Sequence, residues 1–204
     1  MFNLSILQKY AKMFESSPSS LPPTLLLTNT KTSLTLFDKY PKAIYHFLVL
    51  PRILADSEFT AGDLTDLQTL LAKGKKAEAK TLIEGLKKDA EAVREMVEKE
   101  MIKRHGYKWD VWIGFHAVPS MVYVWERWRH NTRTLARFLT CLDPLSHLHL
   151  HVVSSDLCSQ TLKHKKHYNS FHPKLGFFLH VDDVLSWFEG DNASFNNTVT
   201  NPCF

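Results

Sequence analysis

The sequence predicts an α+β fold. The chain has 204 residues, 44% of them hydrophobic, which is enough for one domain with a buried core. Residues 33–52 and 146–156 contain alternating or continuous apolar residues, a pattern typical of strands. Between them, apolar residues recur at helical spacing over residues 63–104. Strands and helices are therefore both expected in one domain.

The first elements are a helix and a hairpin. A short amphipathic helix is expected over residues 4–14, and the breaker-rich stretch SSPSSLPP at 16–23 predicts a linker. The stretch SLTLFDKYPKAIYHFLVLPR, at 33–52, alternates and then runs apolar around a turn at Tyr40 and Pro41. This pattern predicts two antiparallel strands.

Helices and a further strand follow. Two helices are expected between residues 63 and 104, with Gly106 as a stop signal. The Lys and Glu residues of 73–104 are expected to form a solvated outer face. The stretch YKWDVWIGFHAVPS then predicts a strand that ends at Pro119. We expect one domain at 24–189, an N-terminal helix and linker at 1–23, and a polar tail at 190–204.

Composition excludes several classes of protein. The longest apolar runs are strand-sized and the first residues lack the pattern of a secretory signal, so we expect no membrane span. Cys141, Cys158 and Cys203 are odd in number and widely spaced, which predicts a reducing compartment rather than a disulfide framework. The net charge of +4 permits an anionic partner without requiring one.

The stretch SHLHLHVVSSD places three histidines at every second position. His147, His149 and His151 alternate with apolar residues, so a strand would carry them on one face, about 6 to 7 Å apart. Such a cluster suits a metal site, a proton relay or a histidine nucleophile that attacks phosphorus. A solvated histidine face is the structural alternative.

Four blocks in this order carry a family resemblance: FDKYPKAIYHFLVLPR, GFHAVPSM, SHLHLHVVSSDL and LKHKKHYNSF. Together they resemble the histidine-triad (HIT) superfamily, and specifically its aprataxin branch, over roughly residues 34–183. The resemblance implies a HIT fold, an antiparallel sheet with flanking helices. It also implies removal of AMP from the adenylated 5′ DNA ends that abortive ligation leaves, which restores a 5′-phosphate. DNA-repair protein partners and a nuclear location, with the cytoplasm as a second one, are implied as well.

The catalytic histidines are assigned through this resemblance. His149 is the expected nucleophile, and its other ring nitrogen must be held as a hydrogen-bond donor by a carbonyl or an imidazole. His147 and His151 are expected to donate to the phosphate oxygens. His116 matches the family position that assists the leaving group and is the expected acid; an ordinary strand histidine is the alternative.

The first block is expected to bind the nucleotide. Asp38 matches the family's ribose-binding acid, although a turn-forming role before Pro41 is the alternative. Lys42 is expected near phosphate. Phe37 and Leu50 are candidates to sandwich adenine, or else plain core residues. His46 resembles a motif position, but its alternation also allows a structural role.

The block LKHKKHYNSF is expected to contact DNA. Lysines neutralise phosphates without reading sequence, and an aromatic ring can stack on a terminal base. A solvated cationic surface is the alternative. The candidates are Lys166 and His167 first, then Lys163, Lys165 and Tyr168.

One segment departs from the family pattern. In the family the GFHAVPSM block runs almost directly into the histidine strand, whereas residues 122–145 intervene here. A retained intron would explain it, because codons for residues 122–124 can contain GTATGT, a Ser146 codon can begin with AG, and removal keeps the frame. A native arginine-rich insertion that grips DNA is the rival origin, and both stay open.

The expected chemistry needs no cofactor. Aprataxins usually carry a C-terminal zinc finger, but the residues after Gly190 hold one cysteine and no second ligand at finger spacing, so no metal site is expected. Besides a DNA 5′-adenylate hydrolase, two other functions stay open. These are a general HIT nucleotide hydrolase and a nucleotide- or DNA-binding module inactivated by the insertion.

Overall fold

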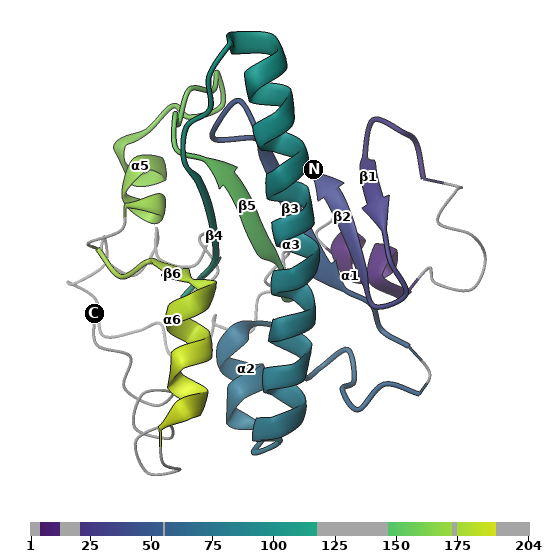
Figure 1. Cartoon of the computed structure of the whole chain (residues 1–204). Helices are drawn as coiled ribbons and strands as arrows, with labels where there is room; N and C mark the ends of the chain where they lie inside the picture. Colours follow the sequence, from purple (N-terminus) through teal and green to yellow (C-terminus); the bar gives the residue numbers. More distant parts are fainter. Residues whose placement is uncertain (1–4, 13–20, 55, 118–146, 173–174, 191–204) are drawn as a thin grey trace, which may run out of the picture.

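The computed structural model describes residues 5–12, 21–54, 56–117, 147–172 and 175–190. They form a six-stranded antiparallel sheet with helices on both faces, which confirms the α+β prediction (Figure 1). No helix in these described ranges is long and apolar enough to cross a membrane. The intervening segment at 122–145, most of the predicted linker at 16–23 and nearly all of the polar tail at 190–204 lie outside the described residues.

The sheet has the order β1-β2-β3-β5-β4-β6, with every neighbouring pair antiparallel. The expected hairpin is confirmed as the β2–β3 pair, and the strand expected after Gly106 is β4. The short strands at the two edges, β1 and β6, were not predicted. The strands are β1 (Leu26–Asn29), β2 (Ser33–Phe37), β3 (His46–Pro51), β4 (Val111–His116), β5 (Leu150–Ser154) and β6 (Phe178–His180).

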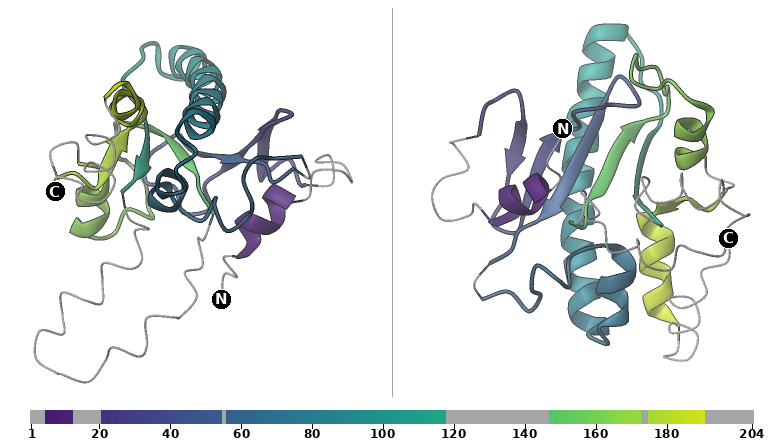
Figure 2. Two further views of the ribbon diagram at one scale, coloured as in Figure 1. Left: turned by 90° about the horizontal axis from the view of Figure 1, so that it is seen from below. Right: turned by 180° about the vertical axis from the view of Figure 1, so that it is seen from behind.

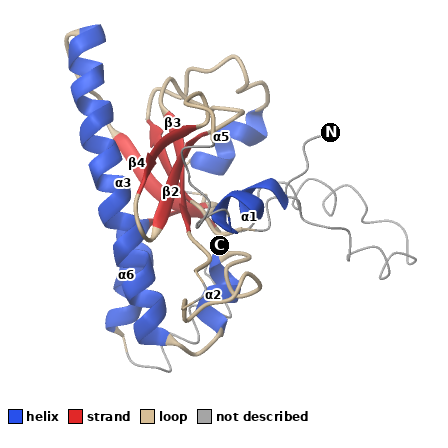
Figure 3. Cartoon of the chain, turned by 90° about the vertical axis from the view of Figure 1, so that its right-hand side faces the viewer, coloured by secondary structure: helices blue, strands red, loops and turns tan. Residues whose placement is uncertain are grey.

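The main core lies between the sheet and the long helix α3 (Lys76–His105). Figures 2 and 3 show α3 and α6 (Val181–Ser186) on one side of the strands. The helix α2 (Leu67–Ala72) adds to this core, and η2 (Trp187–Glu189) follows α6. The burial of apolar side chains is the dominant favourable term in folding, because each large apolar side chain that is removed from water contributes about 1.5–3 kcal/mol. Alternate strand residues point toward α3: Phe47, Val49, Ile113, Phe115, Leu150 and Val152.

The outer face of α3 is charged, as predicted. Its buried residues recur three or four positions apart. The positions that lie between the buried residues carry ion pairs four residues apart: Lys80–Glu84, Lys87–Glu91 and Arg94–Glu98. Gly106 ends the helix in the left-handed conformation, with φ of 80°, which glycine adopts without steric cost. Both helices predicted for residues 63–104 are confirmed.

The opposite face of the sheet carries α1 (Ser5–Lys12) and α5 (Lys165–Phe171) (Figure 3). Leu7 of α1 packs with Leu48 and Leu50 of β3, and Phe171 of α5 packs with Val153 of β5. Between these two small cores, the same face of β3, β4 and β5 holds a cluster of imidazoles. The fold therefore presents the candidate site on the face away from α3.

Candidate functional site

Strand register brings histidines from three strands onto one face of the sheet. In β5, His151 lies opposite Leu48 of β3 and Gly114 of β4. His116 is two residues beyond Gly114, and His46 is two residues before Leu48, so both share its face. The ring of His151 lies 4.5 Å from the ring of His116, centroid to centroid, and 5.2 Å from that of His46.

A glycine at position 114 makes this arrangement possible. A Cβ atom there would lie 2.4 Å from the backbone oxygen of Leu179 and 2.6 Å from the ring of Phe178. The Phe178 ring occupies that space and lies 5.9 Å from the ring of His116. The glycine of the block GFHAVPS is therefore needed for the close approach of β6.

The expected histidine strand is shorter than predicted. It begins at Leu150, so only His151 belongs to it, and His147 and His149 lie in the segment just before it. His147 and His151 are buried and His149 is partly exposed. Of the three, His149 is thus the one that a ligand can most readily reach.

The backbone sets the tautomer of His149. Its Nδ1 lies 2.8 Å from the carbonyl oxygen of His147. A carbonyl only accepts, so Nδ1 donates, and in the neutral ring the lone pair is on Nε2. A carbonyl partner of this kind was expected from the sequence, and it leaves Nε2 as the nitrogen suited to attack phosphorus.

A second chain of hydrogen bonds sets the tautomers of His46 and His151. The backbone N–H of Lys42 donates to Nδ1 of His46 at 3.1 Å, so the proton of the neutral His46 ring is on Nε2. That nitrogen lies 2.9 Å from Nδ1 of His151, which therefore accepts. His151 must then carry its proton on Nε2, a buried atom with no hydrogen-bond partner among the described residues. The result is an unused N–H donor in a ring 4.8 Å from the ring of His149.

His147 is placed differently from the expectation. Its Nε2 lies 2.9 Å from the carbonyl oxygen of Pro51 and donates to it. A neutral imidazole has one N–H, and this bond uses it, so the geometry does not favour His147 as a donor to a phosphate oxygen. Instead it fastens the segment before β5 to the end of β3.

Burial keeps the clustered imidazoles neutral. It lowers the pKa of His46 to about 4, that of His116 to about 3 and that of His147 to about 4. The pKa of His151 is lowered well below its ordinary value, mainly by burial and further by His116 and His149. His116 is therefore a neutral imidazole at neutral pH, rather than the imidazolium that its expected role as an acid suggests.

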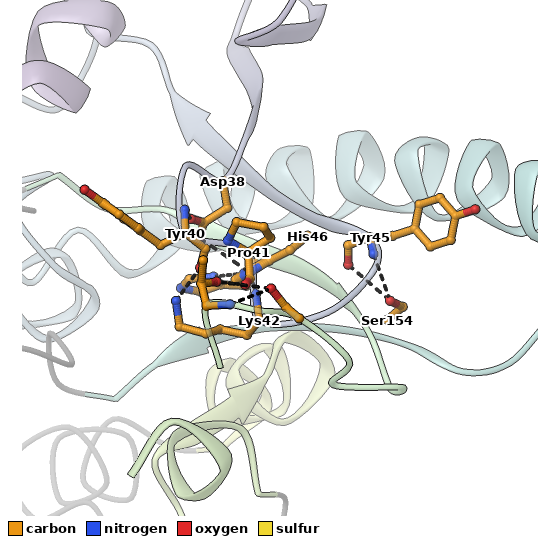
Figure 4. Close-up of polar contacts among 10 residues, drawn as sticks. Asp38, Tyr40, Pro41, Lys42, Tyr45, His46 and Ser154 are labelled. Carbon is orange, nitrogen blue, oxygen red and sulfur yellow. Dashed lines mark hydrogen bonds and ion pairs between the residues drawn. The ribbon is translucent and has the colours of Figure 1, made fainter. Parts of the chain in front are cut away.

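The turn between β2 and β3 brings Asp38 and Lys42 to the cluster (Figure 4). Asp38 Oδ1 accepts from the backbone N–H of Tyr40 at 2.6 Å, which is the turn-forming role named as the alternative, and its Oδ2 lies 3.5 Å from Nδ1 of His46. Lys42 is half-buried and its ammonium donates to the carbonyl of Tyr40. Burial lowers the pKa of Lys42, while the charge of Asp38 raises it. His46 is thus part of the site rather than a separate core residue.

Asp156 was missed by the sequence reasoning. Its carboxylate accepts from the backbone N–H of Ile44 at 3.0 Å, from the indole N–H of Trp109 at 3.0 Å and from the Ser154 hydroxyl. These bonds tie the turn that carries Asp38 to the end of β5. A carboxylate directly after a histidine strand was visible in the sequence, but its partners are 47 and 112 residues away.

The expected adenine sandwich is not formed by Phe37 and Leu50. Register pairs Phe37 with Phe47, on the α3 face, whereas Leu50 pairs with Leu34 on the other face. Leu50 is fully buried against α1, and Phe37 is exposed, with its ring 5.2 Å from that of Phe47. Because the two side chains lie on opposite faces of the sheet, they cannot enclose one ring between them.

The predicted DNA-contacting residues lie in and before α5, beside the cluster. Lys163, Lys165 and Tyr168 are exposed, and His167 is partly buried with its ring 5.4 Å from that of His164. The side chain of Lys166 lies outside the described part of the chain. The last residue of α5, Phe171, is buried against the imidazoles.

Asp38, His46 and His151 offer ligand atoms that lie within 4.8 Å of one another, a spacing that a metal ion could use. The facing nitrogens of the two histidines already share a hydrogen bond of 2.9 Å. An ion at this place would compete with the proton between them.

The chain resembles aprataxins over most of its length. No model of a known protein family matches it. It is 30% identical to aprataxin from Danio rerio over 83% of this chain and 38% of that protein. It is 29% identical to an aprataxin-like protein from Saccharomyces cerevisiae over 86% of this chain and 74% of that protein. The chain thus spans well under half the length of the zebrafish protein. A HIT domain-containing protein from Dictyostelium discoideum is 29% identical over 85% of this chain.

Solved structures share the fold. The aprataxin ortholog Hnt3 from Schizosaccharomyces pombe matches 90% of this chain and 74% of its own with a TM-score of 0.55 at 20% identity. A structure of Hnt3 in complex with DNA covers 94% of this chain and 81% of its own with a TM-score of 0.56 at 19% identity. The described residues therefore adopt the HIT fold.

Proposed function

This chain is an aprataxin-like protein with a HIT fold, and from that premise we propose that it is a DNA 5′-adenylate hydrolase. The observation that carries the proposal is the tautomer of His149, whose Nδ1–H is held by the carbonyl of His147. This tautomer leaves the lone pair on Nε2, where such a reaction needs it.

In the first step, Nε2 of His149 attacks the phosphorus of the AMP group. The N–P bond forms and the bond from phosphorus to the 5′-phosphate oxygen of the DNA breaks, which releases a DNA end with a 5′-phosphate. The unused Nε2–H of His151 donates to the oxygens on which charge develops. His116 assists the leaving oxygen. Because a bound phosphate is an anion, it raises the pKa values of these neutral imidazoles, so that a larger fraction of each ring carries the second proton that can be donated.

In the second step, water attacks the nucleotidyl-histidine. An O–P bond forms to the water oxygen, the N–P bond breaks, and the proton lost by the water goes to solvent. AMP leaves with the new oxygen on its phosphorus, while Nε2 of His149 recovers its lone pair. One difficult displacement is thus divided into two easier ones. The carboxylate of Asp38, placed beside His46, is the candidate acceptor for the ribose hydroxyls.

The exposed cationic residues next to the site favour DNA over a small nucleotide as the substrate. Lys163, Lys165 and Tyr168 are exposed beside the cluster, where a phosphate backbone and a terminal base would lie. Hnt3 has been solved in complex with DNA and guanosine, which supports this choice. A general nucleotide hydrolase would not need this surface.

The test uses nicked duplex DNA with a 5′-adenylate, in buffer without added metal. We expect release of AMP and of a 5′-phosphate end, because histidine supplies the nucleophile. Complete inhibition by a chelator and recovery with zinc would contradict this mechanism. Faster cleavage of a dinucleotide than of adenylated DNA would favour the general nucleotide hydrolase, and DNA binding without turnover would favour the inactivated binding module.

A further inference from the structure

One phenylalanine connects the helix that carries the exposed cationic residues to the imidazole cluster. Phe171 is the last residue of α5 and is 3% exposed, whereas Tyr168, one turn earlier, is 50% exposed. The helix therefore offers its first turn to solvent and inserts its end into the site.

The Phe171 ring touches three imidazoles at once. Its centroid lies 4.8 Å from that of His116, 5.6 Å from His46 and 5.7 Å from His151. The contacts with His46 and His151 are edge-on, at 86° and 88°. These distances are in the range of favourable aromatic pairs, and the ring of Phe178 lies next to that of Phe171, at 5.4 Å between centroids.

A phenyl ring in this position removes water without replacing its hydrogen bonds. A cation loses more solvation than a neutral ring when water is removed, so the contact favours the uncharged form of all three imidazoles. Phe178 is a second phenyl ring beside His116 and His151, at 5.9 and 6.4 Å between centroids. The titratable groups that act on these two rings come from the turn before β3, from β3 and from the segment before β5: Asp38, Lys42, His46 and His149. In β6, the ring of His180 lies against Phe178.

We propose that Phe171 is a positioning residue that couples α5 to catalysis: it keeps the rings of His116, His46 and His151 dry and in place. This inference rests on the proposed function for its link to the reaction. The effect of Phe171 on the histidines, however, can be measured on the protein without substrate. It separates two tasks within α5. The exposed residues bind substrate, and Phe171 sets the protonation of the site.

The experiment compares Phe171→Leu and Phe171→Ala with Phe188→Leu and Phe188→Ala. Phe188 is the matched control, because it is also a buried phenylalanine but packs in the core on the α3 side of the sheet. The C–H resonances of assigned histidines are titrated by NMR in the free proteins. Folding of each variant is checked by its thermal transition, and if Phe171→Ala does not fold, Phe171→Leu carries the test.

We expect the pKa of His116 to rise by on the order of one unit in Phe171→Ala, and in the same direction but by less in Phe171→Leu. The pKa values of His46 and His151 rise with it, and the Phe188 variants leave all three unchanged. With adenylated DNA, the acid limb of the kcat profile moves to higher pH, because water re-entry lets the imidazoles protonate sooner. KM stays the same, since the exposed residues of α5 are untouched.

The two proposals fail in different ways. If the histidine titrations of the Phe171 variants match those of the Phe188 variants, the role of Phe171 is refuted, whatever the substrate. If the native chain releases no AMP from adenylated DNA, the proposed function fails, and the titrations in the free protein still decide the role of Phe171.

Discussion

Bonds to backbone groups decide which ring nitrogen of His149 and of His46 carries the proton. The carbonyl of His147 holds Nδ1–H of His149, and the N–H of Lys42 determines the tautomer of His46 and, through it, that of His151. These backbone groups are held by the sheet and the turn, so the tautomers do not need to adjust when a substrate arrives. The chemistry of the site is thus prepared before binding.

His149→Ala tests the nucleophile. We expect turnover of adenylated DNA to fall by about 10³-fold or more, because the variant lacks the Nε2 lone pair that attacks phosphorus, while AMP binding persists. Product release gives the rate, and calorimetry with AMP gives the affinity. His105→Ala is the control, since His105 is exposed at the end of α3, outside the site. Equal turnover by His149→Ala would remove this residue from its role.

Among the elements, α5 and the β4–β5 pair build most of the site. Residues of β4 and β5 pair directly although about 40 positions separate Val111 from its partner Ser154 along the chain. Ile113, Phe115, Leu150 and Val152 face α3, and the alternation along each strand fixes which side the histidines occupy. The helix α5 then closes the histidine side through Phe171.

The double variant Lys163→Gln/Lys165→Gln tests whether the exposed residues near α5 bind DNA. We expect weaker binding and a shallower dependence of log K on log salt, by about 0.9 for each phosphate that the variant no longer neutralises. The matched control is Lys99→Gln/Lys103→Gln on α3, which changes the net charge equally and involves exposed lysines on the other side of the sheet. Binding is measured by fluorescence anisotropy over a salt series. An identical salt slope for both double variants would show that these lysines are merely solvated.

For the whole molecule, the buried neutral histidines link stability to pH. In the folded chain the pKa values of His46, His147 and His116 are about 4, 4 and 3, whereas an unfolded histidine has a pKa of about 6.5. Between these values the unfolded chain binds more protons than the folded one. The free energy of unfolding therefore decreases as pH falls below about 6.5 and is flat with respect to these groups above about 7.5.

Urea denaturation over pH 4.5 to 8 measures this effect. Each unit of pKa difference corresponds to about 1.4 kcal/mol, so the combined loss at the acid end is expected to reach several kcal/mol. His46→Gln removes one of the titrating groups, so the free energy of unfolding of this variant should fall less steeply as the pH is lowered. If the slope of the free energy of unfolding against pH is the same with and without this substitution, His46 is not held neutral in the folded state.

Deletion of residues 122–145, so that Met121 is joined to Ser146, tests the origin of that segment. The strands on either side, β4 and β5, pair through their own register, and loop length adds only slowly to the cost of closure. If the segment is foreign sequence, we expect equal or higher thermal stability and higher activity on adenylated DNA. A native DNA-binding insertion predicts the opposite: a well-folded deletion variant with lower DNA affinity and a shallower salt dependence.

Local patterns in the sequence were sufficient for most of the secondary structure. The hairpin, both helices before Gly106 and the alternation at His151 were predictable because periodicities of 2 and 3.6 residues follow from backbone geometry. The four blocks identified the HIT fold. The edge strands β1 and β6 were missed, since each has four residues or fewer and a short run carries little periodicity.

What the sequence could not give is how distant residues meet. The face occupied by Phe37 and Leu50 depends on the β2–β3 register, and the role of His147 depends on a carbonyl 96 residues away. The contacts of Phe171 join four separate elements. A residue's type states which bonds it can form, but burial and long-range pairing determine which it does form, and therefore its tautomer, its charge and its access to a ligand.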